Sequence, residues 1–230
     1  MAEIRTKKQA ISTAAKRISS PQKSNEELAA SRLPLGPMGY SGLKSVSGYI
    51  FEEAKRELRW PTAGNTYRKM AYDSSVKSAL NIFTILMGKV PWTVEAPEGA
   101  SKESKEAASF LNYCMGNMED NLSWENFINE VLSYLQYGFH ASEKVFTQVK
   151  VGKWKGKYKW RKLSTLSQDT LYEWIFDEKN GDLIVVKQNP SIIGLCANKG
   201  IPEIPRNKFL LFRFDPKRNN PEGNSPLKGC

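Results

Sequence analysis

The side chains that could carry out acid–base or nucleophilic chemistry are few in this chain. His140 is the only histidine, so a Ser/His/Asp or Cys/His site would have to use it. It lies in the segment YGFHASEKVF, with Ser142 and Glu143 close in sequence. A lone histidine beside such a turn is usually structural, and zinc needs several His or Cys ligands. We therefore expect no catalytic residue, no metal site and no cofactor.

Acidic and glycine-rich segments do not have the spacing of the common binding sites. The segment DEKNGD, from Asp177 to Asp182, lacks the twelve-residue pattern of a calcium loop, and we interpret it as a polar turn at the end of a β-hairpin. Neither a GxxxxGKS/T phosphate loop nor a GxGxxG segment after a strand occurs. An enzyme that uses His140 or a carboxylate stays open as an alternative, and it requires a pocket that converges on those side chains.

One segment, KVGKWKGKYKWRK, concentrates positive charge without an acidic residue. We call it the basic ribbon, and its charged residues are Lys150, Lys153, Lys155, Lys157, Lys159, Arg161 and Lys162. Trp154, Tyr158 and Trp160 alternate with most of these cations, so a strand would have one aromatic face and one basic face. Either the aromatic side chains pack on the core and the lysines are simply solvated, or the basic face binds a polyanion or an acidic neighbour.

Composition bounds the class of protein. The chain has 230 residues and a formal net charge of +10, which favours polyanionic partners but says nothing of the fold. Three cysteines far apart in sequence, Cys114, Cys196 and Cys230, predict neither a disulfide framework nor a zinc site. The longest apolar stretch, from Ala79 to Gly88, is too short to span a bilayer, so we expect no membrane partner.

The first 60 residues differ in composition from the rest. They are basic and have few large apolar side chains, so residues 1–60 are predicted to form an extended arm that is ordered only where it lies on another surface. Its candidate contact residues are Arg5, Lys7, Lys8, Lys16 and Arg17.

Three helices are predicted in the following compact part, residues 61–230. Asp73 is expected to cap the first, which ends near Gly88 and precedes a short strand in PWTVEA. The second spans about 101–118. The third begins at the N-cap Ser123 and ends at Gly138, where a left-handed C-cap is needed.

After Gly138 the apolar period changes from helical to two, which indicates strands. Residues 144–163 are predicted to form a hairpin that turns near Gly152, with Trp154 and Trp160 buried and the lysines facing outward. A second hairpin turns at Asn180-Gly181, and KFLLFRFD is a further strand. The fold class is therefore α+β, with about three helices followed by an antiparallel sheet of about five strands.

The last residues, 215–230, are polar and rich in turn formers. Ser225 followed by Pro226 is typical of a helix start, yet the sequence stops four residues later. We expect this segment to lie at the surface as a connector, and Pro226 to Cys230 to have few packing partners.

Three segments together resemble tailed-bacteriophage portal proteins, and within them the Mu-like group. The resemblance covers about residues 66–230, and each motif is weak by itself, while their order and spacing are more specific. The first motif matches at Asp73, Val76, Ala79, Leu80, Pro91 and Trp92; the second at Tyr137, Gly138, Phe139, Ser142, Glu143 and Val145; the third at Gly223, Ser225 and Pro226. Residues 1–60 match no family.

The resemblance implies a structural protein of the virion, assembled in the host cytoplasm. Such chains form a dodecameric ring at one capsid vertex, through which double-stranded DNA is packaged and ejected. Implied partners are other copies of the chain, the major capsid protein, the terminase, which hydrolyses the ATP, and neck or head–tail adaptor proteins. Residues 61–230 then correspond to the wing, and 215–230 lead toward stem helices, so that stem and clip are absent from this sequence. The alternative is a free-standing basic nucleic-acid-binding module, which binds DNA as a monomer with a steep salt dependence.

Overall fold

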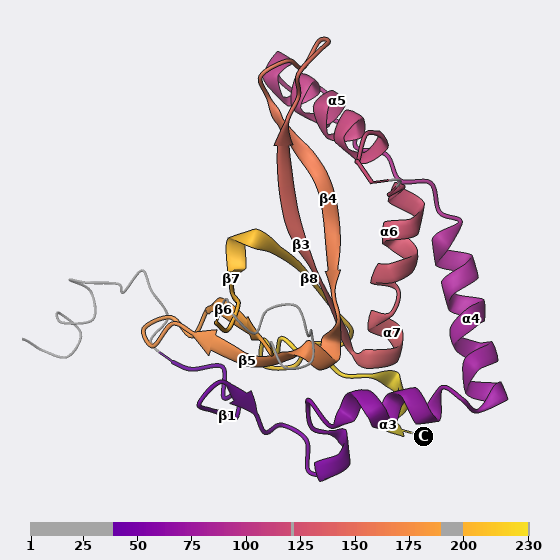
Figure 1. The fold of residues 1–230 in the computed structure, drawn as a ribbon, viewed down its shortest axis with the longest axis vertical. Helices are drawn as coiled ribbons and strands as arrows, with labels where there is room; N and C mark the ends of the chain where they lie inside the picture. The colour runs from indigo at the N-terminus through magenta and orange to yellow at the C-terminus, as the bar shows by residue number, and fades with distance from the viewer. Residues whose placement is uncertain (1–38, 121, 190–199, 230) are drawn as a thin grey trace, which may run out of the picture. The chain divides into compact units, whose positions relative to one another are not determined.

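The structure, a computed structural model, describes residues 39–120, 122–189 and 200–229 (Figure 1). It divides the chain into two units, Met1–Gly39 and Tyr40–Cys230. Apart from Gly39, all of the described residues belong to the second unit. The predictions for the first 38 residues, with the basic side chains named there, lie outside the described residues.

The compact unit begins at Tyr40, twenty residues earlier than the sequence predicted. Strands β1 (Ser45–Val46) and β2 (Tyr49–Ile50) form a small hairpin, and the 3₁₀ helix η1 spans Arg56–Leu58. The backbone N–H of Trp174 donates to the carbonyl of Gly48 over 2.8 Å, which joins this hairpin to strand β5. Ile50 and Leu58 are both buried in the core. Residues 40–60 therefore pack on their own chain, because these apolar side chains reach it.

Helix α3 spans Ala63–Met70, α4 spans Ser74–Gly88 and α5 spans Lys102–Gly116. The last two lie where helices were predicted, whereas α3 was not predicted. The carboxylate of Asp73 accepts from the backbone N–H groups of Ser75 and Val76, and the Ser101 hydroxyl accepts from that of Ser104. The strand predicted in PWTVEA is wrong. The Asn112 side chain bonds both the N–H and the C=O of Val94, so these groups are satisfied without a strand partner.

The third predicted helix is two helices. Helix α6 (Trp124–Val131) begins at its predicted cap Ser123, and the short helix α7 spans Tyr134–Tyr137. Gly138 ends α7 with φ of +93°, as the sequence predicted. The break between α6 and α7 leaves the hydroxyl of Ser133 free to bond residues outside the helices.

A single five-stranded sheet is not formed. Strands β3 (Phe139–Gln148), β4 (Tyr158–Leu166) and β8 (Phe209–Arg213) form one antiparallel sheet in the order β4-β3-β8. Strands β5 (Leu171–Phe176), β6 (Leu183–Gln188) and β7 (Glu203–Pro205) form another in the order β5-β6-β7. The 3₁₀ helix η2 (Gln168–Thr170) turns the chain between β4 and β5, so the two predicted hairpins are present but belong to different sheets.

Three groups of buried side chains hold the unit together. The first lies where the strands of both larger sheets meet and includes Phe139, Trp174 and Phe209. In the second, α6 packs its apolar face, with Phe127 and Val131, against Leu163 of β4. The third joins η1 and α3 to the C-terminal segment through Leu58, Tyr67 and Leu227, so it connects parts that are far apart in sequence.

The C-terminal segment is packed, which corrects the prediction of a surface connector. A 3₁₀ helix, η4 (Pro226–Gly229), starts where the sequence predicted, and the Ser225 hydroxyl accepts from the N–H of Leu227 over 3.1 Å. The residues of this segment that are buried are Asn220, Pro221, Gly223, Ser225 and Leu227. Polarity misled the sequence analysis here, because the polar groups are hydrogen-bonded inside the chain rather than to water.

Candidate functional site

The basic ribbon lies on the β3–β4 hairpin and the connection 149–157, which Figure 1 shows beside α5. The Trp154 side chain is buried against Phe110 and Tyr113 of α5, with ring centroids 5.1 and 6.4 Å apart. Trp160 is half-buried and stacks on Trp124 at 6.3 Å. Both tryptophans thus hold the ribbon to helices, as the packing interpretation of the aromatic residues expects.

A strict division into an aromatic face and a basic face is wrong. Trp154 lies in the connection rather than on β4, and a bulge at Arg161 shifts the register between Trp160 and Lys162. Tyr158 is 67% exposed, whereas the Lys159 side chain is only 14% exposed. A bulge adds one residue to one strand, so the alternation that the sequence suggests is interrupted.

Part of the ribbon is neutralised within its own chain by acidic residues of α5 and the loop after it. The pairs are Lys157 with Glu106 at 2.9 Å, Lys159 with Glu119 at 3.4 Å, and Arg161 with Glu119 at 3.5 Å and Asp120 at 3.4 Å. Lys157 also holds the pKa of Glu106 below its usual value. These partners were missed, although two adjacent acidic residues after a predicted helix were a usable signal.

The other ribbon cations have no such partner. Within the described residues, Lys150, Lys153, Lys155 and Lys162 form no ion pair. The Lys153 ammonium lies 4.5 Å from the centroid of the Trp154 ring, a cation–π distance. Lys150, Lys153 and Lys155 are exposed and close together in the connection, and we call these three residues the hairpin tip. The hairpin tip is the part of the ribbon available to an outside anion.

His140 is buried in a closed hydrogen-bond chain. Gln168 donates to the Ser133 hydroxyl over 2.9 Å, Ser133 Oγ lies 3.0 Å from His140 Nδ1, and His140 Nε2 lies 2.7 Å from Ser142 Oγ. Ser133 accepts from Gln168, and both ring nitrogens of His140 have a serine hydroxyl as partner, so either neutral tautomer is satisfied by one donated and one accepted hydrogen bond. Burial lowers the pKa of His140 to about 4, so the ring is a weak base. Glu143, its neighbour in sequence, is not among these partners.

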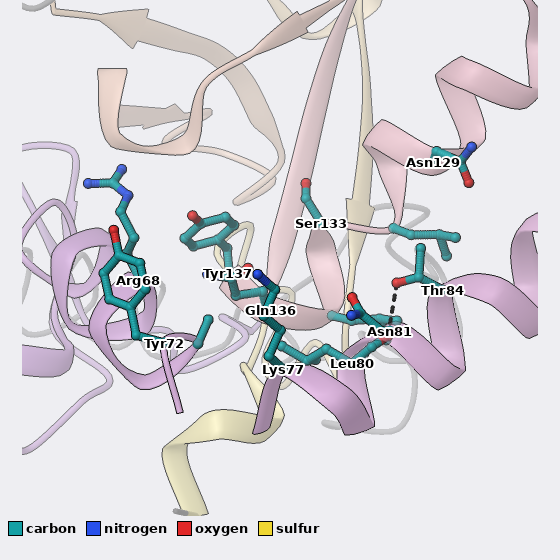
Figure 2. A pocket seen from close by; sticks show the side chains of 13 residues that line it. Arg68, Tyr72, Lys77, Leu80, Asn81, Thr84, Asn129, Ser133, Gln136 and Tyr137 are labelled. Atoms are coloured by element: carbon teal, nitrogen blue, oxygen red, sulfur yellow. Dashed lines mark hydrogen bonds between the residues drawn. The ribbon is translucent and has the colours of Figure 1, made fainter. Parts of the chain in front are cut away.

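A polar hollow of about 380 Å³ lies beside this hydrogen-bond chain, between α3, α4 and the α6–α7 region (Figure 2). Ser133 is on its wall, and Figure 2 shows Arg68, Lys77 and Gln136 around it. No acidic, cysteine or histidine side chain is among the lining residues. The hollow therefore brings no acidic, cysteine or histidine side chain to the Ser133 hydroxyl.

In the described part of the chain, no group of three or more His, Cys, Asp or Glu side chains could hold a metal ion. Among the same residues, no helix is both long enough and apolar enough to cross a membrane.

Helix α4 exposes an apolar surface that the sequence analysis did not predict. None of its residues is buried, and four large side chains are more than half exposed: Ile82 (58%), Phe83 (57%), Ile85 (54%) and Leu86 (63%). An apolar groove of about 620 Å³ lies along the same helix, and its other walls include Tyr134, Phe214 and Leu227.

The second and third sequence motifs meet in space at two glycines. The Gly138 carbonyl accepts from the N–H of Phe214 over 2.8 Å, and the Ser225 hydroxyl donates to the carbonyl of Gln136 over 2.6 Å. A Cβ on Gly138 would lie 2.8 Å from the Glu222 carbonyl oxygen, and Gly138 and Gly223 both have positive φ. Neither position accepts a side chain. YGF and GNSP are thus two sides of one contact, although 85 residues separate the two glycines.

Comparison with known proteins agrees with these motifs. The family described as portal protein of Mu bacteriophage matches residues 65–230, which is more than half of the chain and includes both glycines. No curated protein matches the chain. Portal proteins are structural rather than known enzymes. The chain therefore belongs to the portal protein family of Mu bacteriophage.

Proposed function

We propose that copies of this chain form the portal ring at one vertex of a phage capsid. In this proposal the ring is a dodecamer, and double-stranded DNA passes through it when the genome is packaged and ejected. Its partners are the major capsid protein, the terminase during packaging, and the neck or head–tail adaptor proteins. The protein is then a component of the virion that is assembled in the host cytoplasm and performs no covalent chemistry.

The observation that carries the proposal is the family match over residues 65–230. Membership of a portal family implies oligomerisation and association with a capsid in general terms. The contact at Gly138 and Gly223 supports it further, because two of the motifs that resemble portal proteins depend on one another there. The dodecameric state, the DNA passage and the named partners are the finer parts of the proposal.

Within this function we assign the hairpin tip to an anionic partner. Lys150, Lys153 and Lys155 are exposed and without an ion pair in the described residues, whereas Lys157, Lys159 and Arg161 are already paired. Unpaired cations attract phosphate, because counterions released from DNA favour the association. DNA is the anion that the proposed function supplies.

Electron microscopy of the particle that the protein forms tests the proposal. We expect rings with a central hole in negative stain, and twelve subunits in class averages. A chain that stays monomeric and binds DNA with a steep dependence on salt would support the basic nucleic-acid-binding module instead.

A further inference from the structure

Helix α4 has more apolar surface than the described residues of its own chain cover. At 100° per residue, its large apolar side chains surround the helix except for one polar stripe that includes Lys77, Asn81 and Thr84. Leu80 and Val76 pack toward the core, whereas the opposite side, with Ile82, Ile85 and Leu86, is exposed. A helix that is apolar on nearly all sides is typical of a buried helix, so a second cover is missing on this side.

The size of the uncovered surface suits a protein interface. Six large apolar side chains of α4 and the residues after it are about half exposed: Ile82, Phe83, Ile85, Leu86, Val90 and Trp92. Together they expose on the order of 600 Å². That is close to the roughly 800 Å² that each partner buries in a standard interface. From Ala79 to Gly88 the helix has no charged residue, so this surface does not suit DNA.

A second exposed apolar surface lies on another part of the unit. Tyr40, Val46 and Phe51, on and beside the β1–β2 hairpin, are exposed. This hairpin packs on β5, through the contact of Gly48 with Trp174 and a ring contact between Tyr49 and Tyr172 at 6.3 Å. Helix α4 lies instead next to α6 and α7, so the two surfaces are separate.

We propose that the exposed side of α4 in one copy packs on the β1–β2 hairpin surface of a second copy. The inference rests on the proposed ring and names its contact. A closed ring of identical subunits requires two unlike surfaces on every subunit, each matched to the other. The chain offers two such surfaces, and one repeated contact between them covers both. Leu86 and Ile82 are the α4 residues at its centre, with Val46 and Phe51 opposite.

Two charge substitutions on opposite sides of the contact test this arrangement. Leu86→Asp disables the α4 surface and leaves the hairpin surface intact, whereas Val46→Asp does the reverse. Each variant alone is expected to lose all species larger than a monomer in sedimentation velocity. An equimolar mixture is expected to form dimers and nothing larger, because one intact surface of each kind remains. Ile184→Asp, at another exposed apolar residue on β6, is the control and should assemble as the unchanged chain does.

The outcomes separate this inference from the proposed function. Rings that persist in both variants would overturn the α4 contact and leave the portal function standing. Dimers of Val46→Asp alone would show that α4 pairs with α4, and would also overturn it. If Leu86→Asp lowers the melting temperature of the monomer by more than Ile184→Asp does, the α4 surface is covered within its own chain and the inference is wrong. An unchanged chain that stays monomeric contradicts both proposals.

Discussion

At the scale of single residues, two buried titratable groups, Glu222 and His140, make the stability of the protein depend on pH. Trp174, which is fully buried, donates its indole N–H to the Glu222 carboxyl over 3.2 Å, and burial raises the pKa of Glu222 to about 8. The residue as a whole keeps some exposed surface, but its carboxyl group is the part that faces this interior. Burial also lowers the pKa of His140, at a different place in the core. Each group is therefore neutral in the folded protein over a range where the unfolded chain has it charged.

We expect the unchanged protein to lose stability as the pH rises toward 8, and we expect Glu222→Gln to remove this loss. Between the ordinary pKa of 4.5 and about 8, the folded protein keeps a proton on Glu222 that the unfolded chain releases. The free energy of unfolding therefore falls with rising pH, by at most about 1.4 kcal/mol per pH unit. Urea titrations between pH 6.5 and 8 measure this slope. Glutamine should flatten it, whereas Glu178→Gln, an exposed control at the β5–β6 turn, should not.

His140 should stay neutral down to about pH 4 in the folded protein. Because its pKa is lowered from 6.5, its contribution to stability is complete above that pH and is lost as the pH falls toward 4. It is the only histidine, so one set of imidazole signals reports on it. NMR of the ring nitrogens should show a neutral imidazole, with one protonated nitrogen, at pH 7. A titration midpoint near 6.5 would contradict the closed hydrogen-bond chain with Ser133 and Ser142.

At the scale of elements, the β3–β4 hairpin is divided into a paired part and a free part. Its paired cations lie against α5 and the loop after it, whereas the three lysines of the hairpin tip lie in the connection and form no ion pair with a described residue. Exposed ion pairs of this kind contribute little to stability, because water and salt screen them. Their larger effect is on binding, because a cation paired with a carboxylate attracts an outside phosphate less strongly.

We expect the triple change Lys150→Glu, Lys153→Glu and Lys155→Glu to weaken binding of double-stranded DNA. Each phosphate contact that is lost reduces the slope of log affinity against log salt by about 0.9. Fluorescence anisotropy at several salt concentrations measures both quantities. A matched variant with Lys44, Lys69 and Lys179 changed to Glu has the same net charge and alters exposed lysines elsewhere. Equal losses in the two variants would mean that overall charge, rather than the hairpin tip, governs binding.

At the scale of the whole molecule, the C-terminal segment closes the compact unit. Leu227 packs with Leu58 and Tyr67, and Lys228 forms an ion pair with Glu53 at 3.4 Å. These contacts join residues of the first and last parts of the Tyr40–Cys230 unit. Because Gly138 and Gly223 fix the same segment from the other side, its position depends on several elements at once.

Leu227→Ala should destabilise the unit by about 2–5 kcal/mol, the range for a buried leucine whose loss leaves a cavity. The midpoint of urea unfolding measures the effect. Leu111→Ala on α5 is the matched control, and it should cost less because Leu111 is exposed. If the two changes lower the free energy of unfolding equally, Leu227 is not packed and the segment is the surface connector that the sequence alone predicted.

The sequence by itself determined the local structure of this protein. The caps at Asp73, Ser101 and Ser123 and the left-handed Gly138 were predictable, because each depends on hydrogen bonds or backbone angles within a few residues. The hairpins were predictable for the same reason. The motifs around the two glycines also indicated the portal family, which the match over residues 65–230 confirmed.

Tertiary structure alone decided the partition into separate sheets, the burial of the C-terminal segment, the pairing of the ribbon cations and the exposed side of α4. Each of these depends on groups far apart in sequence, as Lys157 and Glu106 or Gly138 and Glu222 illustrate. An apolar stripe predicts that a helix needs a cover, but it does not say which chain supplies that cover. For the same reason, a lysine-rich strand looks alike in sequence whether its partners are acidic residues of its own chain or the phosphates of DNA.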